Sequence, residues 1–212
     1  MEIIIESLYK KFDDTFVLKN VNLKLNDNHI YGFVGRNGSG KSVLFKILCG
    51  LYYPTEGHVI IDGIDIHKKD VFPKDMRVLI EKPNFLPNLS GLENLKLLAS
   101  IQNKITENDI IKTLKKVNLE KDMTKLYHKY SLGMKQKLAI AQVLMEDPKI
   151  MIFDEPLNGI EEKTANIIRQ ILLDEKSKGK IILIASHIKD DIEKMADVIF
   201  NVNDGEISLV KE

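Results

Sequence analysis

The first part of the chain carries short, β-rich hydrophobic segments of the kind that form half-buried antiparallel strands. They cover residues 2–7 and 17–25, and in the second segment apolar side chains alternate with Asn and Lys. Residues 53–66 combine a proline and two glycines around the apolar run VIID, which indicates a turn and a hairpin. This region is therefore predicted to contain antiparallel β structure.

A second pattern predicts a parallel α/β core. Residues 29–34 run apolar into a glycine cluster, and residues 41–51 have the length and spacing of a helix. Residues 150–153 and 181–185 are continuous apolar runs separated by a segment of helix length. Such runs are typical of central parallel strands, which are buried on both faces and linked by a crossover helix.

Residues 89–145 have a different character, because apolar residues recur there at spacings of three and four and glycine is scarce. This spacing is typical of helices. A chain of 212 residues suits one domain with a substantial core. We therefore expect a single α/β domain over residues 1–212, with an antiparallel β subdomain and an inserted α-helical subdomain. The core is expected at about 1–85 and 148–212, and the helical lobe at about 86–147.

Charge is balanced over the whole chain but not along it. The 31 Lys and Arg residues match 31 Asp and Glu residues, so the net charge is zero. A neutral chain has no general attraction to nucleic acid or to an anionic membrane surface, and no nucleic-acid partner is expected. Residues 96–137, however, contain ten lysines against four acidic residues. Such an excess indicates either a solvated helix face or a docking surface for a partner.

The sequence also indicates a cellular setting. No window approaches 18 consecutive apolar residues, and the first residues lack the basic start and small-residue cleavage site of a signal peptide. The one cysteine, Cys49, lies in an apolar run and is expected to be a small buried residue. We therefore expect a reducing, cytoplasmic environment.

The glycine cluster matches the phosphate-binding pattern G-x-x-x-x-G-K-[ST] in full, between a predicted strand and a predicted helix. Its residues are Gly35, Arg36, Asn37, Gly38, Ser39, Gly40, Lys41 and Ser42. The glycines let successive backbone N–H groups face phosphate oxygens, and the helix adds the positive end of its dipole. Lys41 is expected to reach the β- and γ-phosphates, and the Ser42 hydroxyl to ligate Mg²⁺. The motif predicts a P-loop fold that binds a nucleoside triphosphate.

Two adjacent acids end the predicted strand at residues 150–153. Unpaired buried charge is costly, so adjacent carboxylates at the end of a buried strand indicate that they face a site. In a P-loop fold, Asp154 is placed to hold the Mg²⁺ shell and Glu155 to polarise the attacking water. A pair of helix-capping acids is the alternative interpretation.

Four further features occur in an order that resembles the ABC ATPase family. They are the segment YSLGMKQK at residues 130–137, the segment NGIE at 158–161, His187 after the run at 181–185, and Phe12 ahead of the segment at 17–25. They are similar to the family's signature motif, its D-loop, its switch histidine and its adenine-stacking aromatic residue. The resemblance covers essentially the whole chain.

This resemblance implies a nucleotide-binding subunit of an ABC transporter, with ATP and Mg²⁺ as cofactors. Ser131 and Gly133 would contact the γ-phosphate of ATP held by a second copy or a paired ATPase subunit. A separate membrane permease would be the other partner, which places the chain on the inner face of the cell membrane. His187 would assist Glu155 and Lys41 in hydrolysis, although a single histidine is more often an ordinary core or surface residue. Phe12 can equally be a core aromatic residue.

The sequence departs from the family pattern at three positions. Glu81 stands where the family has a glutamine in the Mg²⁺ and water network, so a further metal contact is expected there. Val43 replaces a frequent threonine near the α-phosphate, and Glu161 replaces the D-loop aspartate. With the segment that follows it, Glu81 resembles the bacitracin-resistance and lantibiotic-immunity branch. That branch implies export of a membrane-active peptide antibiotic.

Two other functions fit part of the sequence. A P-loop small-molecule kinase shares the glycine loop but has no use for the motif at residues 130–137 or for His187. A non-transport ABC protein acting on nucleic acid or the ribosome would be a nucleic-acid binding module with an ATP switch. Members of that kind usually carry long coiled coils or two tandem ATPase units, and this chain has neither.

Overall fold

A computed structural model describes residues 1–81 and 84–211. One sheet is antiparallel, with its strands in the order β2-β1-β4-β5. The bounds are β1 Glu2–Phe12, β2 Thr15–Asn26, β4 Glu56–Ile61 and β5 Ile64–Asp65. The prediction of antiparallel strands and a hairpin is confirmed, but β1 extends five residues beyond the predicted 2–7, whereas β2 exceeds the predicted 17–25 only slightly. Register shifts along β1 interrupt the alternation of side chains, so the hydrophobic period ends before the strand does.

The second sheet has the strand order β10-β9-β3-β8-β7-β6. Its strands are β3 His29–Val34, β6 Met76–Leu79, β7 Ile150–Asp154, β8 Ile181–Ser186, β9 Val198–Asn203 and β10 Glu206–Lys211. All neighbouring pairs are parallel except β9 and β10. All six residues of β8 are buried, which confirms the central parallel strands predicted from the apolar runs. The hydrophobic pattern did not predict β6, β9 or β10.

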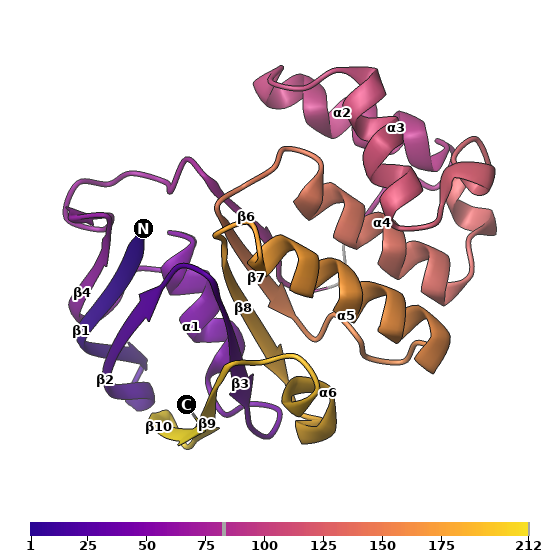
Figure 1. Ribbon diagram of the computed structural model, residues 1–212. Helices are drawn as coiled ribbons and strands as arrows, with labels where there is room; N and C mark the ends of the chain where they lie inside the picture. The colour runs from indigo at the N-terminus through magenta and orange to yellow at the C-terminus, as the bar shows by residue number, and fades with distance from the viewer. Residues whose placement is uncertain (82–83, 212) are drawn as a thin grey trace.

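Helices cover both faces of this parallel sheet. Helix α1 (Lys41–Leu48) lies between the two sheets, whereas α5 (Glu162–Lys176) and α6 (Lys189–Glu193) lie on the opposite face (Figure 1). Neighbouring residues of β7 point to different sides, so Ile152 belongs to the core beneath α1 and Phe153 to the core beneath α5. Helix α1 is shorter than the predicted 41–51, because the chain turns at Gly50, whose φ is +80°.

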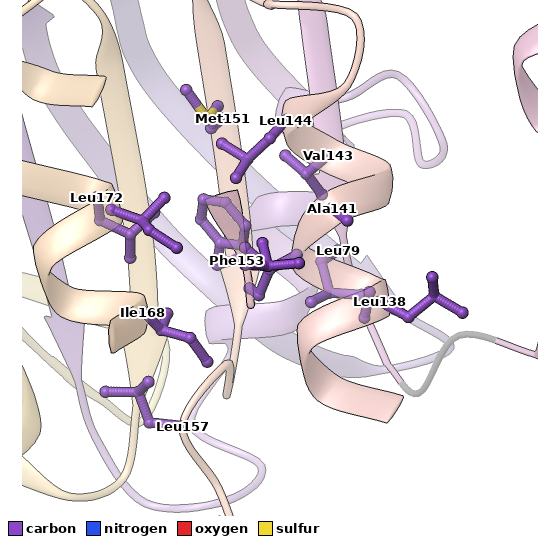
Figure 2. Packing of buried hydrophobic residues seen from close by; sticks show 14 of the residues in the cluster. Leu79, Leu138, Ala141, Val143, Leu144, Met151, Phe153, Leu157, Ile168 and Leu172 are labelled. Carbon is purple, nitrogen blue, oxygen red and sulfur yellow. The ribbon is translucent and has the colours of Figure 1, made fainter. Parts of the chain in front are cut away.

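The predicted helical stretch forms α2 (Gly91–Gln102), α3 (Glu107–Lys116) and α4 (Leu132–Leu144), with 3₁₀ turns at Glu120–Asp122 and Tyr127–Lys129. These helices lie between β6 and β7 in the chain and gather at one end of the molecule (Figure 1). Figure 2 shows that side chains of α4, including Leu138 and Leu144, meet Phe153 and the α5 side chains Ile168 and Leu172 in one buried cluster. Hydrophobic packing therefore continues from the helical lobe into the core.

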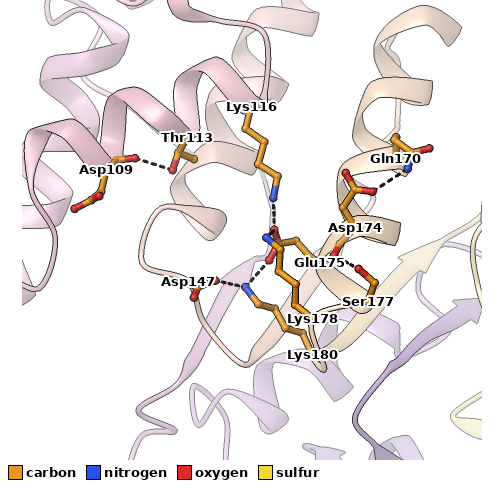
Figure 3. Close-up of polar contacts among 10 residues, drawn as sticks. All are labelled: Asp109, Thr113, Lys116, Asp147, Gln170, Asp174, Glu175, Ser177, Lys178 and Lys180. Atoms are coloured by element: carbon orange, nitrogen blue, oxygen red, sulfur yellow. Dashed lines mark hydrogen bonds and ion pairs between the residues drawn. The ribbon is translucent and has the colours of Figure 1, made fainter.

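A buried carboxylate adds a polar link between the lobe and the core. Glu175, near the end of α5, is 2% exposed and pairs with Lys116 of α3, Lys178 and Lys180 (Figure 3). Lys180 also pairs with Asp147. Burial raises the pKa of Glu175, but the hydrogen bonds and charges of the three lysines outweigh it and lower the pKa to about 2. Glu175 is therefore an ionised hub that connects α3, α5 and the turns before β7 and β8.

Candidate functional site

The phosphate loop runs from the end of β3 into α1, as the sequence predicted. Gly40, directly before α1, has a φ of +110°, and a Cβ there would lie 2.8 Å from the backbone oxygen of Val17. A Cβ on Gly35 would lie 2.2 Å from the backbone oxygen of Val202. Only glycine fits both positions. The first turn of α1 contains no acidic residue, and the positive end of its dipole faces the loop.

Lys41 and Ser39 are the buried polar side chains of this loop. The Lys41 ammonium donates to the backbone oxygens of Gly35 at 2.6 Å and Arg36 at 3.0 Å. Burial lowers the pKa of Lys41, while the charges of Glu155 and Asp154 act to raise it. The Ser39 hydroxyl is buried and has no hydrogen-bond partner within residues 1–81 and 84–211. Buried hydroxyls are rarely left unpaired, so Ser39 fits a loop that receives an oxygen-rich ligand.

The two acids at the end of β7 face the start of α1. The Ser42 hydroxyl donates to the Asp154 carboxylate. Burial raises the pKa of Asp154, and the hydrogen bond from Ser42 opposes that shift. Glu155 has a φ of +52°, and its N–H donates to the Ala185 carbonyl at 2.9 Å, which seats the turn after β7 on β8. Both acids lie at the carboxyl end of the parallel strands, where open α/β sheets bind ligands.

This donor set suits Mg²⁺ bound together with a nucleotide. A hydroxyl and a carboxylate oxygen are hard ligands, and Mg²⁺ is commonly held by one or two carboxylates plus substrate phosphates. No group of three or more His, Cys, Asp and Glu side chains in the described parts of the chain is arranged to hold a metal ion without such phosphates. The residues present therefore fit a metal that arrives with a nucleoside triphosphate.

His187 lies against Glu155. Its backbone N–H donates to Glu155 Oε1 at 3.0 Å, and its ring nitrogen Nδ1 lies 2.9 Å from Glu155 Oε2. The Ser186 hydroxyl contacts the same Oε2 at 3.4 Å. The end of β8 thus holds both carboxylate oxygens of Glu155 in place. The structure brings together two residues that are 32 positions apart in the chain.

Glu81 shares a pocket with Asp154 and Glu155, but its carboxylate contacts Lys46, which was not predicted from the sequence. Its Oε1 accepts a hydrogen bond from the Lys46 ammonium at 2.6 Å. That hydrogen bond lowers the pKa of Glu81 and raises the pKa of Lys46. Lys46 follows Ser42 by one helical turn, so the i,i+4 spacing could have placed it on the same face of α1.

Of two further expected ligand contacts, Val43 lies beside the phosphate loop, whereas Phe12 lines neither pocket at Asp154 and Glu155. Val43 lines a pocket of about 280 Å³ together with the loop residues, Asp154 and Glu155. Phe12 ends β1 with 41% of its surface exposed, so it is not a core residue. Its ring meets Tyr52 edge-on at 5.7 Å, and the Lys10 ammonium lies 4.7 Å from its centre. The contact between Phe12 and Tyr52 was not predicted from the sequence.

Ser131 and Gly133 lie at the start of α4. The Ser131 hydroxyl caps this helix by accepting from the Met134 N–H at 3.3 Å, and Ser131 is exposed. Ser131 and Gly133 line neither of the two pockets at Asp154 and Glu155, although Leu132, which lies between them, lines one of these pockets. The structure therefore brings Lys41, Ser42, Asp154, Glu155 and His187 together, while the exposed Ser131 remains accessible to another molecule.

A comparison with protein-family models matches the ABC transporter family over residues 18–158. The chain is 41% identical over 201 residues to an uncharacterized ABC transporter ATP-binding protein, YybJ of Bacillus subtilis (strain 168), covering 95% of this chain and 92% of that protein. It is 37% identical to the bacitracin transport ATP-binding protein BcrA of Enterococcus faecalis, covering 98% and 68%. It is 36% identical to the lantibiotic transport ATP-binding protein SrtF of Streptococcus pyogenes, covering 98% and 90%.

Solved structures share the architecture. The dimeric structure of MJ0796, a bacterial ABC transporter cassette, has a TM-score of 0.86 at 25% identity and is matched over 99% of both chains. A nucleotide-free ATP-binding cassette from an ABC transporter has a TM-score of 0.88 at 25% identity, covering 100% of this chain and 92% of that one. The fold and the P-loop site define an ATP-binding cassette ATPase. The chain belongs to the ABC transporter family, as an ATP-binding subunit.

The family assignment rules out the small-molecule kinase interpretation. Among residues 1–81 and 84–211, no helix has the length and apolar character needed to cross a membrane.

Proposed function

We propose that this chain hydrolyses MgATP to power a transporter that exports membrane-active peptide antibiotics. The observation that carries the hydrolytic part is the chain of contacts from Ser42 to Asp154 and from Glu155 to His187, at the mouth of the phosphate loop. Positioning and charge neutralisation supply most of the catalysis of phosphoryl transfer, and these contacts provide fixed groups of the required kinds.

Each group has a proposed role in this reaction. The backbone of residues 35–40 and the Lys41 ammonium bind the phosphates, and Phe12 stacks on the adenine. Ser42 and Asp154 hold Mg²⁺, which when bound neutralises charge on the phosphate oxygens. Glu155 accepts the proton of the attacking water, and the His187 ring fixes the Glu155 carboxylate and contacts the γ-phosphate. Glu81 would join the metal shell after leaving Lys46.

The site is proposed to be completed by a second subunit. Ser131, which is exposed, and Gly133, which is half-buried, lie at the start of α4 and would contact the γ-phosphate bound by a second copy or a paired ATPase subunit. The dimeric assembly named for MJ0796 supports this arrangement. A permease would hold the dimer at the inner face of the cell membrane, with the helical lobe at about 86–147 and the Glu81 loop as the contact region.

Relatives named for bacitracin and lantibiotic transport, at 37% and 36% identity, support a peptide antibiotic as the exported substrate. Expression of the chain with its permease in a sensitive strain tests this proposal. We expect resistance to bacitracin or a lantibiotic to rise, and to depend on Glu155. Unchanged sensitivity to both peptides, with the permease in the membrane and ATP hydrolysed, would show that the substrate is a different one.

A Glu155→Gln variant tests the hydrolytic role. The amide is isosteric but a much weaker base, so we expect phosphate release to fall by about 10² to 10⁴. ATP binding should remain, and ATP should hold the variant in a dimer. Glu120→Gln, which changes an exposed acid in the helical lobe, is the control and should hydrolyse at the normal rate. Normal hydrolysis by Glu155→Gln would show that another group is the base.

A further inference from the structure

Arg169 is a buried cation that the proposed reaction does not use. It lies in the middle of α5 and is 5% exposed. One terminal nitrogen contacts Glu162 Oε1 at 2.8 Å and Asn166 Oδ1 at 2.7 Å. The other contacts Asp191 Oδ1 of α6 at 2.7 Å. The guanidinium therefore links Glu162 and Asn166 of its own helix, α5, to Asp191 of α6.

Stability alone is a weak reason for a cation at this position. Moving a charge out of water is costly, and replacing a buried ion pair with apolar residues is often neutral or stabilising. The Arg169 Nε is also buried, with no hydrogen-bond partner in the described part of the chain. An unpaired buried N–H adds to the cost. The value of Arg169 must therefore lie in what it holds in place.

The groups that Arg169 holds lie close in the chain to the proposed catalytic residues. Asp191 lies in α6, four residues after His187, and packs in a tight region near Pro156 and Ser186. The opposite side of α6 packs on β3, where a Cβ on Gly32 would lie 2.1 Å from Ile192 Cγ2. Helix α6 is thus fixed by close packing on one side and by Arg169 on the other.

The other ion pair reaches the segment at 158–161. Glu162 follows this segment directly and is the first residue of α5. Its carboxylate also receives Lys194 at 3.4 Å, and the Glu162 side chain is 64% exposed, whereas the Asp191 side chain is only 16% exposed. Exposed pairs contribute little, so the pair with Asp191 is the stronger restraint that Arg169 supplies.

We propose that Arg169 is a positioning residue that sets the His187 ring on the Glu155 carboxylate by fixing α6 through Asp191. Because α6 has only five residues and packs on the sheet by one side, loss of the ion pair leaves its other side unrestrained and loosens the turn that carries His187. This inference rests on the proposed roles of Glu155 and His187 in hydrolysis.

Steady-state hydrolysis and the NMR signal of the His187 ring test the proposal in the full-length protein. The signal is assigned by its absence in His187→Gln, which distinguishes it from His29, His58, His67 and His128. We expect Arg169→Met and Asp191→Leu each to lower kcat by about 10-fold or more, since small misplacements of catalytic groups are costly. ATP affinity should stay within about twofold, because the phosphate loop is untouched. The His187 signal should shift in both variants.

Two further variants separate positioning from stability. Arg169→Lys keeps the charge but one ammonium cannot span Glu162 and Asp191, so it should restore kcat only in part. Lys194→Met removes the other cation at Glu162 and should leave kcat and the His187 signal unchanged. If Arg169→Met does not fold, Asp191→Asn, which keeps the acceptor oxygen but removes the charge, should give smaller changes in the same direction.

A folded Arg169→Met or Asp191→Asn with wild-type kcat, or with an unshifted His187 signal, would overturn the proposal. The signal does not depend on turnover. If Glu155→Gln hydrolyses ATP normally, the catalytic roles proposed for Glu155 and His187 are wrong. The shift of the His187 ring signal would still test whether Arg169 positions His187.

Discussion

The Glu175 hub predicts a specific dependence of stability on pH. The perturbation is Glu175→Gln, which keeps the size of the side chain but removes its charge. Lys116, Lys178 and Lys180 then lose their shared counterion, and Lys180, which is 6% exposed, keeps only its contact with Asp147. Removing one partner of a buried ion pair typically costs about 3 to 5 kcal/mol, and the remaining contact with Asp147 places the expected loss at the lower end of this range.

The pKa of Glu175 gives an independent magnitude. It falls from an ordinary value of 4.5 to about 2 in the folded protein. At about 1.4 kcal/mol per pKa unit, this difference corresponds to about 3 kcal/mol at neutral pH. A carboxylate with a lowered pKa stabilises the fold above its unfolded pKa, and this stabilisation is lost as the pH falls toward the folded pKa. Linkage predicts a loss of about 1 kcal/mol between pH 7 and pH 4, and about 2 kcal/mol by pH 3.

Urea unfolding followed by far-UV circular dichroism measures both effects, since the chain has no tryptophan to report by fluorescence. We expect Glu175→Gln to be about 3 kcal/mol less stable than the wild type at pH 7, and the gap to narrow as the pH falls. Glu120→Gln, at an exposed acid, should match the wild type at each pH. A gap between wild type and Glu175→Gln that stays constant from pH 7 to pH 3 would refute the reasoning.

Three further outcomes follow from individual contacts. Gly32→Ala should lower stability by about 1 to 3 kcal/mol in thermal melts, because its Cβ would overlap Ile192; an unchanged melting temperature would contradict this packing. Lys46→Met should lower the Mg²⁺ concentration needed for half-maximal hydrolysis, because it frees the Glu81 carboxylate. Lys46→Met introduced into the Glu81→Gln variant should leave that Mg²⁺ concentration unchanged. Phe12→Ala should weaken binding of a fluorescent ATP analogue by about fivefold, the loss of one aromatic contact, whereas equal affinity would place the adenine elsewhere.

Much of the site could be predicted from short segments of sequence. The loop at residues 35–42 and the acids at 154 and 155 are contiguous motifs, and their geometry follows from the strand that precedes each of them. The parallel strands β7 and β8 were predictable for the same reason, since burial on both faces leaves a continuous apolar run. By contrast, β6 has four residues and lies on the edge of the sheet, so its segment carries a weaker signal.

Long side chains were the part that the sequence could not place. Glu81 was expected at the metal, yet its carboxylate lies on Lys46, 35 residues earlier in the chain. Arg169 reads as an ordinary residue of an amphipathic helix until α6 is packed beside it. Glu175 meets Lys116 across 59 positions. In each case the partner is chosen by how two elements pack, and neither segment contains that information alone.

By itself, then, the sequence determined the main-chain motifs, the α/β class and the ABC-type order of the site. The tertiary structure decided which charges meet: Glu155 with His187, Glu81 with Lys46, and the buried pairs that fix α6 and the helical lobe. The physical reason is the separation along the chain over which each kind of interaction acts. Backbone conformation and hydrophobic period are set by neighbours within a few residues, whereas an ion pair forms only after folding has brought distant elements within about 4 Å.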